Sequence, residues 1–271
     1  MTVEIHPTAT VDPRAELAPG VLVGPHAVIG PQVEIGADTE VGAGAQVRGP
    51  SRIGAGNRIF PHACVGFEPQ DLKYQGEETR LEVGDRNVFR ELCTVNRGTA
   101  KGGGVTRIGD DNLFMAYAHV AHDCLVGNRT IFANGATLAG HVEVQDDASI
   151  SAFTSIHQFC RVGRHAYVGG YSVITQDALP FVKTVGIKPA CYGINRIGLE
   201  RKGMSGETIR RLDAALRVLL RGKRNVAESL EVLRREHAGV PELDYLIDFV
   251  ATAQRGVIRT LPGRKGGRGG S

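Results

Sequence analysis

The chain contains 271 residues, of which 42% are hydrophobic and 23% are charged, and its formal net charge is +3. This length and composition are those of a globular protein and exclude a disulfide-stapled miniprotein, while the lack of a Gly-X-Y period excludes collagen. No run approaches the ~18 apolar residues of a membrane span, and residues 1–10 show no basic and apolar leader, so we expect neither a membrane span nor a secretory signal. Five widely spaced cysteines without a CxxC pair favour a reducing, cytoplasmic location.

A six-residue repeat of large apolar residues runs through the first two thirds of the chain. Eleven such residues follow one another at a spacing of six from Ile5 to Val65, and twelve more from Ile108 to Ile174, with a short series between them at Val83, Phe89 and Val95. Because a period of six fits neither an α-helix nor a plain strand, it predicts a parallel β-helix in which each hexad forms one strand and one corner. Three hexads make one coil, which gives about nine coils.

Within each hexad the apolar residue is often followed by glycine, and the fifth position is usually small. We expect the apolar residue to point into the prism, the small residue to fit beside it, and the glycine to ease the corner.

Two segments interrupt the repeat, residues 71–82 and residues 101–107. Insertions in a solenoid lie on its corners and often carry its binding surface. The β-helix is therefore predicted to span residues 1–187 with two inserted loops.

The pattern becomes helical after the repeat ends. Ser205 is expected to cap a helix that runs to about Arg221, Asn225 to cap a second helix, and Pro241 to open a third. Residues 188–259 are thus predicted to form a C-terminal helical domain, and residues 260–271, rich in glycine and arginine, a disordered tail.

Charge divides along the same boundary, because the formal net charge is −5 over residues 1–187 and +8 over residues 188–271. A basic helical end is typical either of a docking surface for an acidic partner or of a solvated helical surface. Nucleic acid is a less suitable partner, because aromatic residues are not interleaved with the basic ones.

Four histidines lie at spacings that place them on one edge of the predicted prism over adjacent coils, and these are His119, His122, His141 and His157. Histidine is the usual general base near neutral pH, so this edge is the candidate active site. Asp123 follows His122 directly, and it either supports the imidazole from a corner or serves as a turn residue that binds backbone amides.

The first inserted loop contains Gln70, Asp71 and Lys73, and the last two are suited either to bind a sugar hydroxyl and an anionic group or to form a local salt pair. The run Gly102-Gly103-Gly104 is interpreted as a flexible corner, because no helix pattern follows it as a phosphate-binding loop would require.

Four stretches resemble the acyl-carrier-protein–UDP-N-acetylglucosamine O-acyltransferases: Gln70-Asp-Leu-Lys-Tyr74, Ala118-His-Val-Ala-His-Asp-Cys124, Ala136-Thr-Leu-Ala-Gly-His141 and Ile156-His-Gln-Phe-Cys160. The resemblance extends from residue 1 to about residue 259. It implies a left-handed parallel β-helix with a C-terminal α-helical domain. It also implies the first step of lipid A synthesis, in which a 3-hydroxyacyl group moves from acyl carrier protein to the 3-hydroxyl of UDP-N-acetylglucosamine without a cofactor or a metal.

The resemblance further implies roles for individual residues. His122 would be the general base, Asp123 its support, and the Gly140 N–H the donor to the thioester oxyanion, a role that fits the logic of oxyanion stabilisation. The remaining positions that match substrate contacts are Gln70, Asp71, Lys73, His119, His141, His157 and Gln158.

Asn195 and Arg201 match positions that hold the uridine diphosphate, and Gly170 matches the position that sets the length of the acyl chain. The family works as a homotrimer with sites between subunits, and the basic helical end would receive acidic acyl carrier protein. Two residues depart from the family pattern: Ile197 stands where well-known members carry an acidic residue, and Tyr171 stands where smaller residues are common.

Other functions stay open from the sequence. One is N-acylation of a 3-amino sugar nucleotide by a related enzyme. Another is a hexapeptide carbonic anhydrase whose zinc is held by histidines such as His119 and His122. A purely structural solenoid is disfavoured, because its outward positions would repeat one residue type, whereas here they are mixed and charged.

Overall fold

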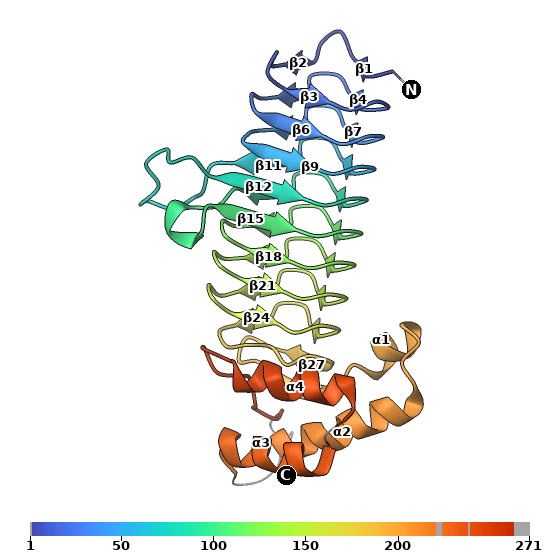
Figure 1. Ribbon diagram of the computed structural model, residues 1–271, viewed down its shortest axis with the longest axis vertical. Coiled ribbons are helices and arrows are strands. Elements are labelled where there is room, and N and C mark those ends of the chain that lie inside the picture. The colour runs from blue at the N-terminus through green and yellow to red at the C-terminus, as the bar shows by residue number, and fades with distance from the viewer. Residues whose placement is uncertain (1, 221–223, 238, 263–271) are drawn as a thin grey trace, which may run out of the picture.

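A computed structural model describes residues 2–220, 224–237 and 239–262. The chain winds into a long left-handed prism of stacked coils, and a group of helices packs at the C-terminal end of the prism (Figure 1). Within the described residues the strands form three sheets, one on each face of the prism, which we call A, B and C, and all their pairings are parallel except the last one of sheet A. The predicted left-handed β-helix with a C-terminal helical part is thereby confirmed.

Each sheet takes every third strand of the chain. Sheet A contains β1 (Glu4–Ile5), β4 (Leu22–Val23), β7 (Glu40–Val41), β10 (Arg58–Ile59), β13 (Val88–Phe89), β16 (Leu113–Phe114), β19 (Ile131–Phe132), β22 (Ser149–Ile150), β25 (Tyr167–Val168), β27 (Val182–Val185) and β28 (Ala190–Ile194). Sheet B contains β2 (Thr10–Val11), β5 (Val28–Ile29), β8 (Gln46–Val47), β11 (Cys64–Phe67), β14 (Thr94–Asn96), β17 (His119–Val120), β20 (Thr137–Leu138), β23 (Ser155–Ile156) and β26 (Val173–Ile174). Sheet C contains β3 (Glu16–Leu17), β6 (Val33–Ile35), β9 (Ser51–Ile53), β12 (Arg80–Val83), β15 (Val105–Ile108), β18 (Leu125–Val126), β21 (Glu143–Val144) and β24 (Arg161–Val162).

The interior of the prism is filled as the hexads predict. The repeated apolar residue is the second residue of most strands and is buried, whereas the first residue of the strand points outward. The small fifth residues, such as Ala27 and Ala136, are fully buried beside it. Phe89, Phe114 and Phe132 stack along the axis with ring centroids 4.9 and 4.7 Å apart, and each such pair contributes about 0.5–1.5 kcal/mol beyond the area that it buries.

The corners differ from the expectation in one respect. The residue with positive φ is not the glycine after the apolar residue but the residue two positions further on, and it is often not glycine, as at Asp123 (φ 59°) and His141 (φ 61°). The hexad glycines meet another need, because a Cβ on Gly36 would lie 2.6 Å from the backbone of Gly54 in the next coil. These glycines therefore permit close stacking of coils rather than an unusual backbone conformation.

Three edges run along the prism where the sheets meet, and we name them by the sheets that they join in chain order: the AB, BC and CA edges. The excursion between β11 and β12 and the excursion between β14 and β15 both leave from the BC edge. They project together from one side of the prism (Figure 1). The second excursion contains a short 3₁₀ helix, η1 (Ala100–Gly102).

The C-terminal part begins with a hairpin and continues as helices. Strands β27 and β28 pair antiparallel, so sheet A continues past residue 187, the expected boundary. The helices are α1 (Arg196–Arg201), α2 (Gly206–Leu220), α3 (Val226–His237) and α4 (Pro241–Ala251). Asn225 caps α3 as predicted, because its Oδ1 accepts the N–H of Glu228 at 2.9 Å. In the expected tail, the Thr260 carbonyl accepts the Cys191 N–H, and residues 263–271 lie outside the described residues.

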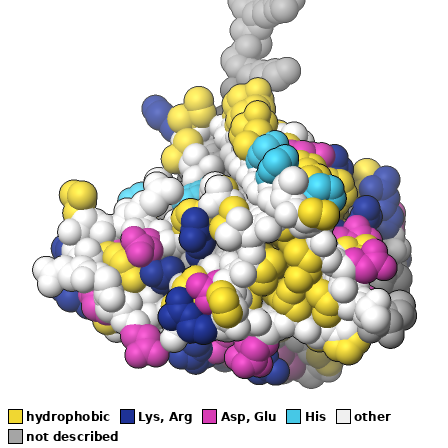
Figure 2. Space-filling model, turned by 90° about the horizontal axis from the view of Figure 1, so that it is seen from above, with side chains coloured by type: hydrophobic (Ala, Val, Ile, Leu, Met, Phe, Trp, Pro, Cys, Tyr) yellow, Lys and Arg dark blue, Asp and Glu magenta, His cyan; other side chains and the backbone are white. Residues whose placement is uncertain are grey.

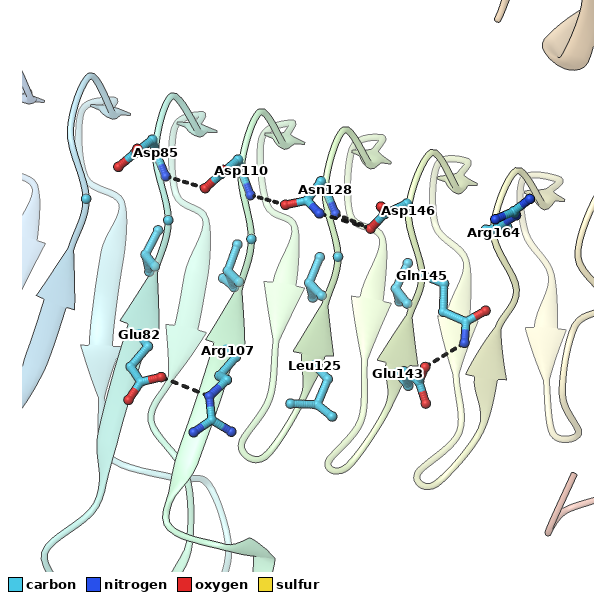
Figure 3. A pocket seen from close by; sticks show the side chains of 18 of the residues that line it. Glu82, Asp85, Arg107, Asp110, Leu125, Asn128, Glu143, Gln145, Asp146 and Arg164 are labelled. Atoms are coloured by element: carbon cyan, nitrogen blue, oxygen red, sulfur yellow. Dashed lines mark hydrogen bonds and ion pairs between the residues drawn. The ribbon is translucent and has the colours of Figure 1, made fainter. Parts of the chain in front are cut away.

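A groove of about 860 Å³ runs along the outer face of sheet C toward Tyr245 of α4 (Figure 3). Along its border the side chains of Asp110, Asn128 and Asp146 each accept the backbone N–H of the residue one coil before, at 2.8 Å. This ladder satisfies backbone donors at the CA edge and ties successive coils together. At the opposite end, hydrophobic side chains of the first coil remain exposed (Figure 2), among them Ile5 at 47%.

Candidate active site

The BC edge carries a histidine–aspartate pair between β17 and β18. The Nδ1 atom of His122 lies 2.8 Å from Oδ2 of Asp123. The side chain of Asp123 is 1% exposed and that of His122 is 16% exposed. With Nδ1 held by the carboxylate, Nε2 is the nitrogen of His122 that is available to a substrate.

The Asp123 carboxylate is held by residues of the second excursion. The N–H of Thr99 donates to Oδ1 at 2.8 Å, and the Thr99 hydroxyl donates to Oδ2 at 2.6 Å. The backbone N–H of Asp123 donates to the Thr106 hydroxyl at 2.8 Å. Asp123 therefore plays both of the roles weighed from the sequence, since it binds a backbone amide and also contacts the imidazole.

Gly140 lies directly against His122 from the next coil. A Cβ on Gly140 would lie 2.5 Å from Cε1 and 2.8 Å from Nε2 of His122. Among the described residues no acceptor takes the Gly140 N–H, so this donor is free beside the imidazole. The pair brings together an imidazole and a backbone N–H donor, groups that are suited to act as a general base and as an oxyanion donor in acyl transfer.

Two further histidines flank the pair. The ring of His141 lies 5.2 Å from that of His122, and its Nε2 is 3.7 Å from Oδ2 of Asp123. His119 is bonded through Nδ1 to the Thr94 hydroxyl at 2.7 Å. Burial lowers the pKa of both His119 and His141, and for His141 the charge of Asp123 opposes this effect without overcoming it. Both rings are therefore neutral near pH 7 and suited to hydrogen bonding.

The other histidine of the predicted edge lies further along it. His157 and Gln158 are exposed at the BC edge one coil beyond His141, and Phe159 stacks on His141 with ring centroids 4.5 Å apart. The structure thus places the four predicted histidines on neighbouring coils of one side.

The first excursion lies near this cluster. Gln70 and Lys73 are exposed, and Oδ1 of Asp71 accepts the Lys73 backbone N–H at 3.0 Å. The charge of Asp71 also acts on the pKa of His141, which it raises against the larger effect of burial. A pocket of about 670 Å³ adjoins the excursion and is lined by Gln70 and by Thr94, the partner of His119.

Asn195 and Arg201 do not join this cluster within one chain. Asn195 precedes α1, and its side-chain amide donates to the carbonyl of His165 at the CA edge at 3.1 Å. Arg201 is exposed at the end of α1, and the next residue, Lys202, forms an ion pair with Asp147 of the CA edge at 2.7 Å. Ile197, on the same helix, is 64% exposed.

Gly170 lies on the third edge, AB, between β25 and β26. A Cβ there would lie 3.3 Å from the Ala152 carbonyl oxygen and 4.0 Å from Ser151, so the space beside it is largely open. Tyr171 is 68% exposed and stacks on Phe153 with ring centroids 5.3 Å apart.

The residues that could hold a metal ion differ from those expected for a zinc enzyme. His122, Asp123 and His141 place their ligand atoms within 4.8 Å of one another, whereas His119 is not in this group. The Asp123 oxygen that would bind the ion is already engaged by Thr99 and His122.

Thr94, Thr99 and Thr106 are site residues that the sequence does not reveal. Nothing in the hexad pattern distinguishes them, because a threonine on a strand or in a loop is common. Within the glycine run, Gly102 ends η1 against the Asp123 carboxylate, whereas Gly103 and Gly104 have positive φ and open space beside them.

Two family models match the chain. One, described as UDP N-acetylglucosamine O-acyltransferase, domain 2, matches residues 177–258, and one described as bacterial transferase hexapeptide (six repeats) matches residues 106–140. In the described ranges, no helix has the length and apolar character needed to cross a membrane.

Curated relatives and solved structures agree with these models. The acyl-[acyl-carrier-protein]–UDP-N-acetylglucosamine O-acyltransferase of Thiobacillus denitrificans is 52% identical over 203 residues, which cover 75% of this chain and 79% of the relative. The enzyme of the same name from Alkalilimnicola ehrlichii is 51% identical over 197 residues, 73% of this chain and 76% of the relative. The crystal structure of a UDP-N-acetylglucosamine acyltransferase from Bacteroides fragilis matches with a TM-score of 0.92 at 40% identity, covering 94% of this chain and all of the other. The chain belongs to the family of acyl-[acyl-carrier-protein]–UDP-N-acetylglucosamine O-acyltransferases.

Proposed function

We propose that this enzyme transfers a 3-hydroxyacyl group from acyl carrier protein to the 3-hydroxyl of UDP-N-acetylglucosamine, the first step of lipid A biosynthesis, with His122 as the general base. The observation that carries the assignment of the base is the buried contact between His122 and Asp123. Relatives that are about half identical to this chain carry the name of the same reaction.

Asp123 prepares His122 for this role. A carboxylate at Nδ1 fixes the tautomer that leaves Nε2 unprotonated, and it stabilises the imidazolium that forms when Nε2 takes a proton. The neighbouring rings of His119 and His141 stay neutral because burial lowers their pKa, so they do not compete as acids.

The reaction then follows from the positions of these groups. Nε2 of His122 removes the proton of the sugar 3-hydroxyl while that oxygen attacks the thioester carbonyl carbon. The Gly140 N–H stabilises the resulting oxyanion. As the carbon–sulfur bond breaks, the imidazolium returns its proton to the departing thiolate, so the enzyme ends in its starting state.

Substrate contacts are assigned to the remaining predicted residues. Gln70, Asp71 and Lys73 of the first excursion, together with His141, His157 and Gln158, face the same edge as the base and suit the sugar and its phosphates. Asn195 and Arg201 belong to another edge of the prism. We therefore assign the nucleotide end of the site to the Asn195 and Arg201 of a second subunit in a homotrimer.

The partner that delivers the acyl group is acyl carrier protein. Residues 188–271 carry a net charge of +8, which complements an acidic protein and favours fast encounter. Because acyl carrier protein and nucleotide sugars are cytoplasmic substrates, we assign the enzyme to the cytoplasm.

The test is acyl transfer from 3-hydroxyacyl carrier proteins of several chain lengths to UDP-N-acetylglucosamine, with the wild type beside His122→Ala. Loss of a general base should lower the rate by roughly 10²–10⁴. The exposed corner histidine His62, which lies two coils away and on the AB edge, provides the control variant His62→Ala, which should retain wild-type activity. A wild type that is inactive with every chain length but acylates a 3-amino sugar nucleotide would contradict the proposed acceptor.

A further inference from the structure

The second excursion closes over a carboxylate that is otherwise cut off from solvent. Asp123 is 1% exposed in its side chain, and Thr99 is 6% exposed. A carboxylate that water does not reach depends on hydrogen-bond donors from the protein. The Thr99 N–H and hydroxyl supply one donor to each carboxylate oxygen, at 2.8 and 2.6 Å.

The direction of the Thr99 hydroxyl is fixed by the loop itself. Its oxygen accepts the N–H of Gly102 at 3.2 Å, so its own hydrogen is free to point at Oδ2 of Asp123. The Gly104 N–H donates to the Thr99 carbonyl at 2.8 Å, which closes the turn. Thr99 is thus held from both sides in the orientation that serves the carboxylate.

The loop approaches Asp123 so closely that only glycine fits at one position. A Cβ on Gly102 would lie 2.0 Å from Cγ of Asp123 and 2.2–2.3 Å from its oxygens. The φ of Gly102 is not in the left-handed region, so the close approach alone accounts for the glycine.

We propose that Thr99 is a positioning residue for acyl transfer, which fixes the Asp123 carboxylate so that its Oδ2 faces Nδ1 of His122. The effect on the reaction rests on the proposed function. The inference assigns the excursion between β14 and β15 to the support of the base rather than to substrate binding.

The tautomer of His122 separates this role from simple support of the loop. While Oδ2 of Asp123 faces Nδ1, the neutral ring carries its proton on Nδ1 and leaves Nε2 free. Without the Thr99 hydroxyl, the loop holds the carboxylate only through the Thr99 N–H at Oδ1, so Oδ2 is no longer fixed toward the ring. The share of neutral His122 rings that carry the proton on Nε2 should therefore increase in Thr99→Val.

The experiment compares the wild type with Thr99→Val, which removes the hydroxyl and keeps the size, and with Thr99→Ser, which keeps the hydroxyl. Thr39→Val is the matched control. Thr39 is also buried, and its hydroxyl donates to the carbonyl of Gly54 in the next coil at 3.0 Å, but it lies far from His122 and Asp123. Each variant is measured by kcat/KM, by ¹⁵N NMR of the His122 ring, which shows which nitrogen carries the proton and needs no substrate, and by thermal unfolding.

We expect Thr99→Val to lower kcat/KM about tenfold, less than loss of the base itself, and to move the ¹⁵N signals of His122 toward those of a ring protonated on Nε2. Thr99→Ser should match the wild type, and Thr39→Val should lose stability while the ¹⁵N signals of His122 stay in place. If Thr99→Val does not fold, Thr99→Ala removes the same donor with fewer atoms and carries the same test.

Unchanged ¹⁵N signals of His122 in a folded Thr99→Val or Thr99→Ala overturn the inference, whatever the activity. If the signals move as expected but the wild type transfers no acyl group, the positioning role stands and the proposed function fails.

Discussion

Oδ2 of Asp123 lies 2.8 Å from Nδ1 of His122, although the two residues are adjacent in the chain and would point to opposite faces of an extended strand. The corner removes this difficulty, because Asp123 adopts a φ of 59° and turns its side chain back toward the imidazole. Aspartate tolerates this conformation better than most residues. The pair is thus a product of the corner geometry of the prism.

Asp123→Asn should lower kcat by roughly 10²–10⁴, because the amide can donate to Nδ1 and stabilise the tautomer with a protonated Nε2. The measurement is kcat over a range of pH with saturating substrates. Asp38→Asn serves as the control, since Asp38 occupies another corner with nearly the same backbone conformation, φ 56°. Equal activity in the two variants would contradict a role for Asp123 in the reaction.

Gly140→Ala should lower activity by about 10² or more, because the new methyl group would lie 2.5 Å from Cε1 of His122 and displace the ring. The control is Gly30→Ala, which lies in a coil far from His122. The new Cβ there would lie 3.4 Å from its nearest neighbour, an ordinary contact. Activity and thermal unfolding are measured together. An active Gly140→Ala would show that His122 need not occupy the position seen here.

Gly170→Met should shift the preference of the enzyme toward shorter acyl chains, because the long side chain fills the open space beside Gly170. The ratio of kcat/KM between a long and a short 3-hydroxyacyl carrier protein should change by about tenfold or more, since each methylene in an apolar pocket contributes about 1–3 kcal/mol. Gly170→Ala should give a smaller shift in the same direction. An unchanged ratio in both variants would place the end of the acyl chain elsewhere.

Stability should decrease as pH falls from about 7.5 to 5.5. Burial lowers the pKa of His119 below its ordinary value of 6.5, so the unfolded chain binds more protons than the folded one in this range. The contribution is fully present above pH 6.5 and is lost as pH falls toward the folded pKa. Carboxyl groups such as Glu82, whose pKa is lowered from 4.5 mainly by a hydrogen bond from Arg80, lose their contribution only at more acidic pH.

Urea unfolding of the wild type and His119→Gln at both pH values measures this effect. The variant should lose less free energy of unfolding than the wild type over the same range, with His141 and His165 accounting for part of the remaining loss because burial lowers their pKa too. The same loss in both proteins would show that His119 is not the group responsible.

Much of the fold is predictable because the hexad repeat is a local and periodic signal. A residue such as Ile59 must be buried once its coil forms, and it is 1% exposed. The hairpin of β27 and β28 and the short helix α1 are not predicted, because the repeat ends at Ile174 and their few residues carry no periodicity of their own. Their conformation depends on contacts with the last coil, such as the bond from Asn195 to His165.

The candidate site likewise contains features that the repeat predicts and features that it does not. The spacing of His119, His122, His141 and His157 is enough to predict that they share one edge, since the coil length fixes which residues stack. Thr99 cannot be found in this way, because the excursion that contains it has no period and its contact with Asp123 spans 24 residues of sequence.

The sequence by itself determined the coiled architecture and the edge that carries the histidines, because burial of one apolar residue in six admits few other solutions. Only the tertiary structure decided which nitrogen of His122 is free, how Thr99 and Gly102 enclose Asp123, and that Asn195 lies on a different edge from the base. These features depend on hydrogen-bond geometry and close packing between segments distant in the chain, which the order of residues does not display.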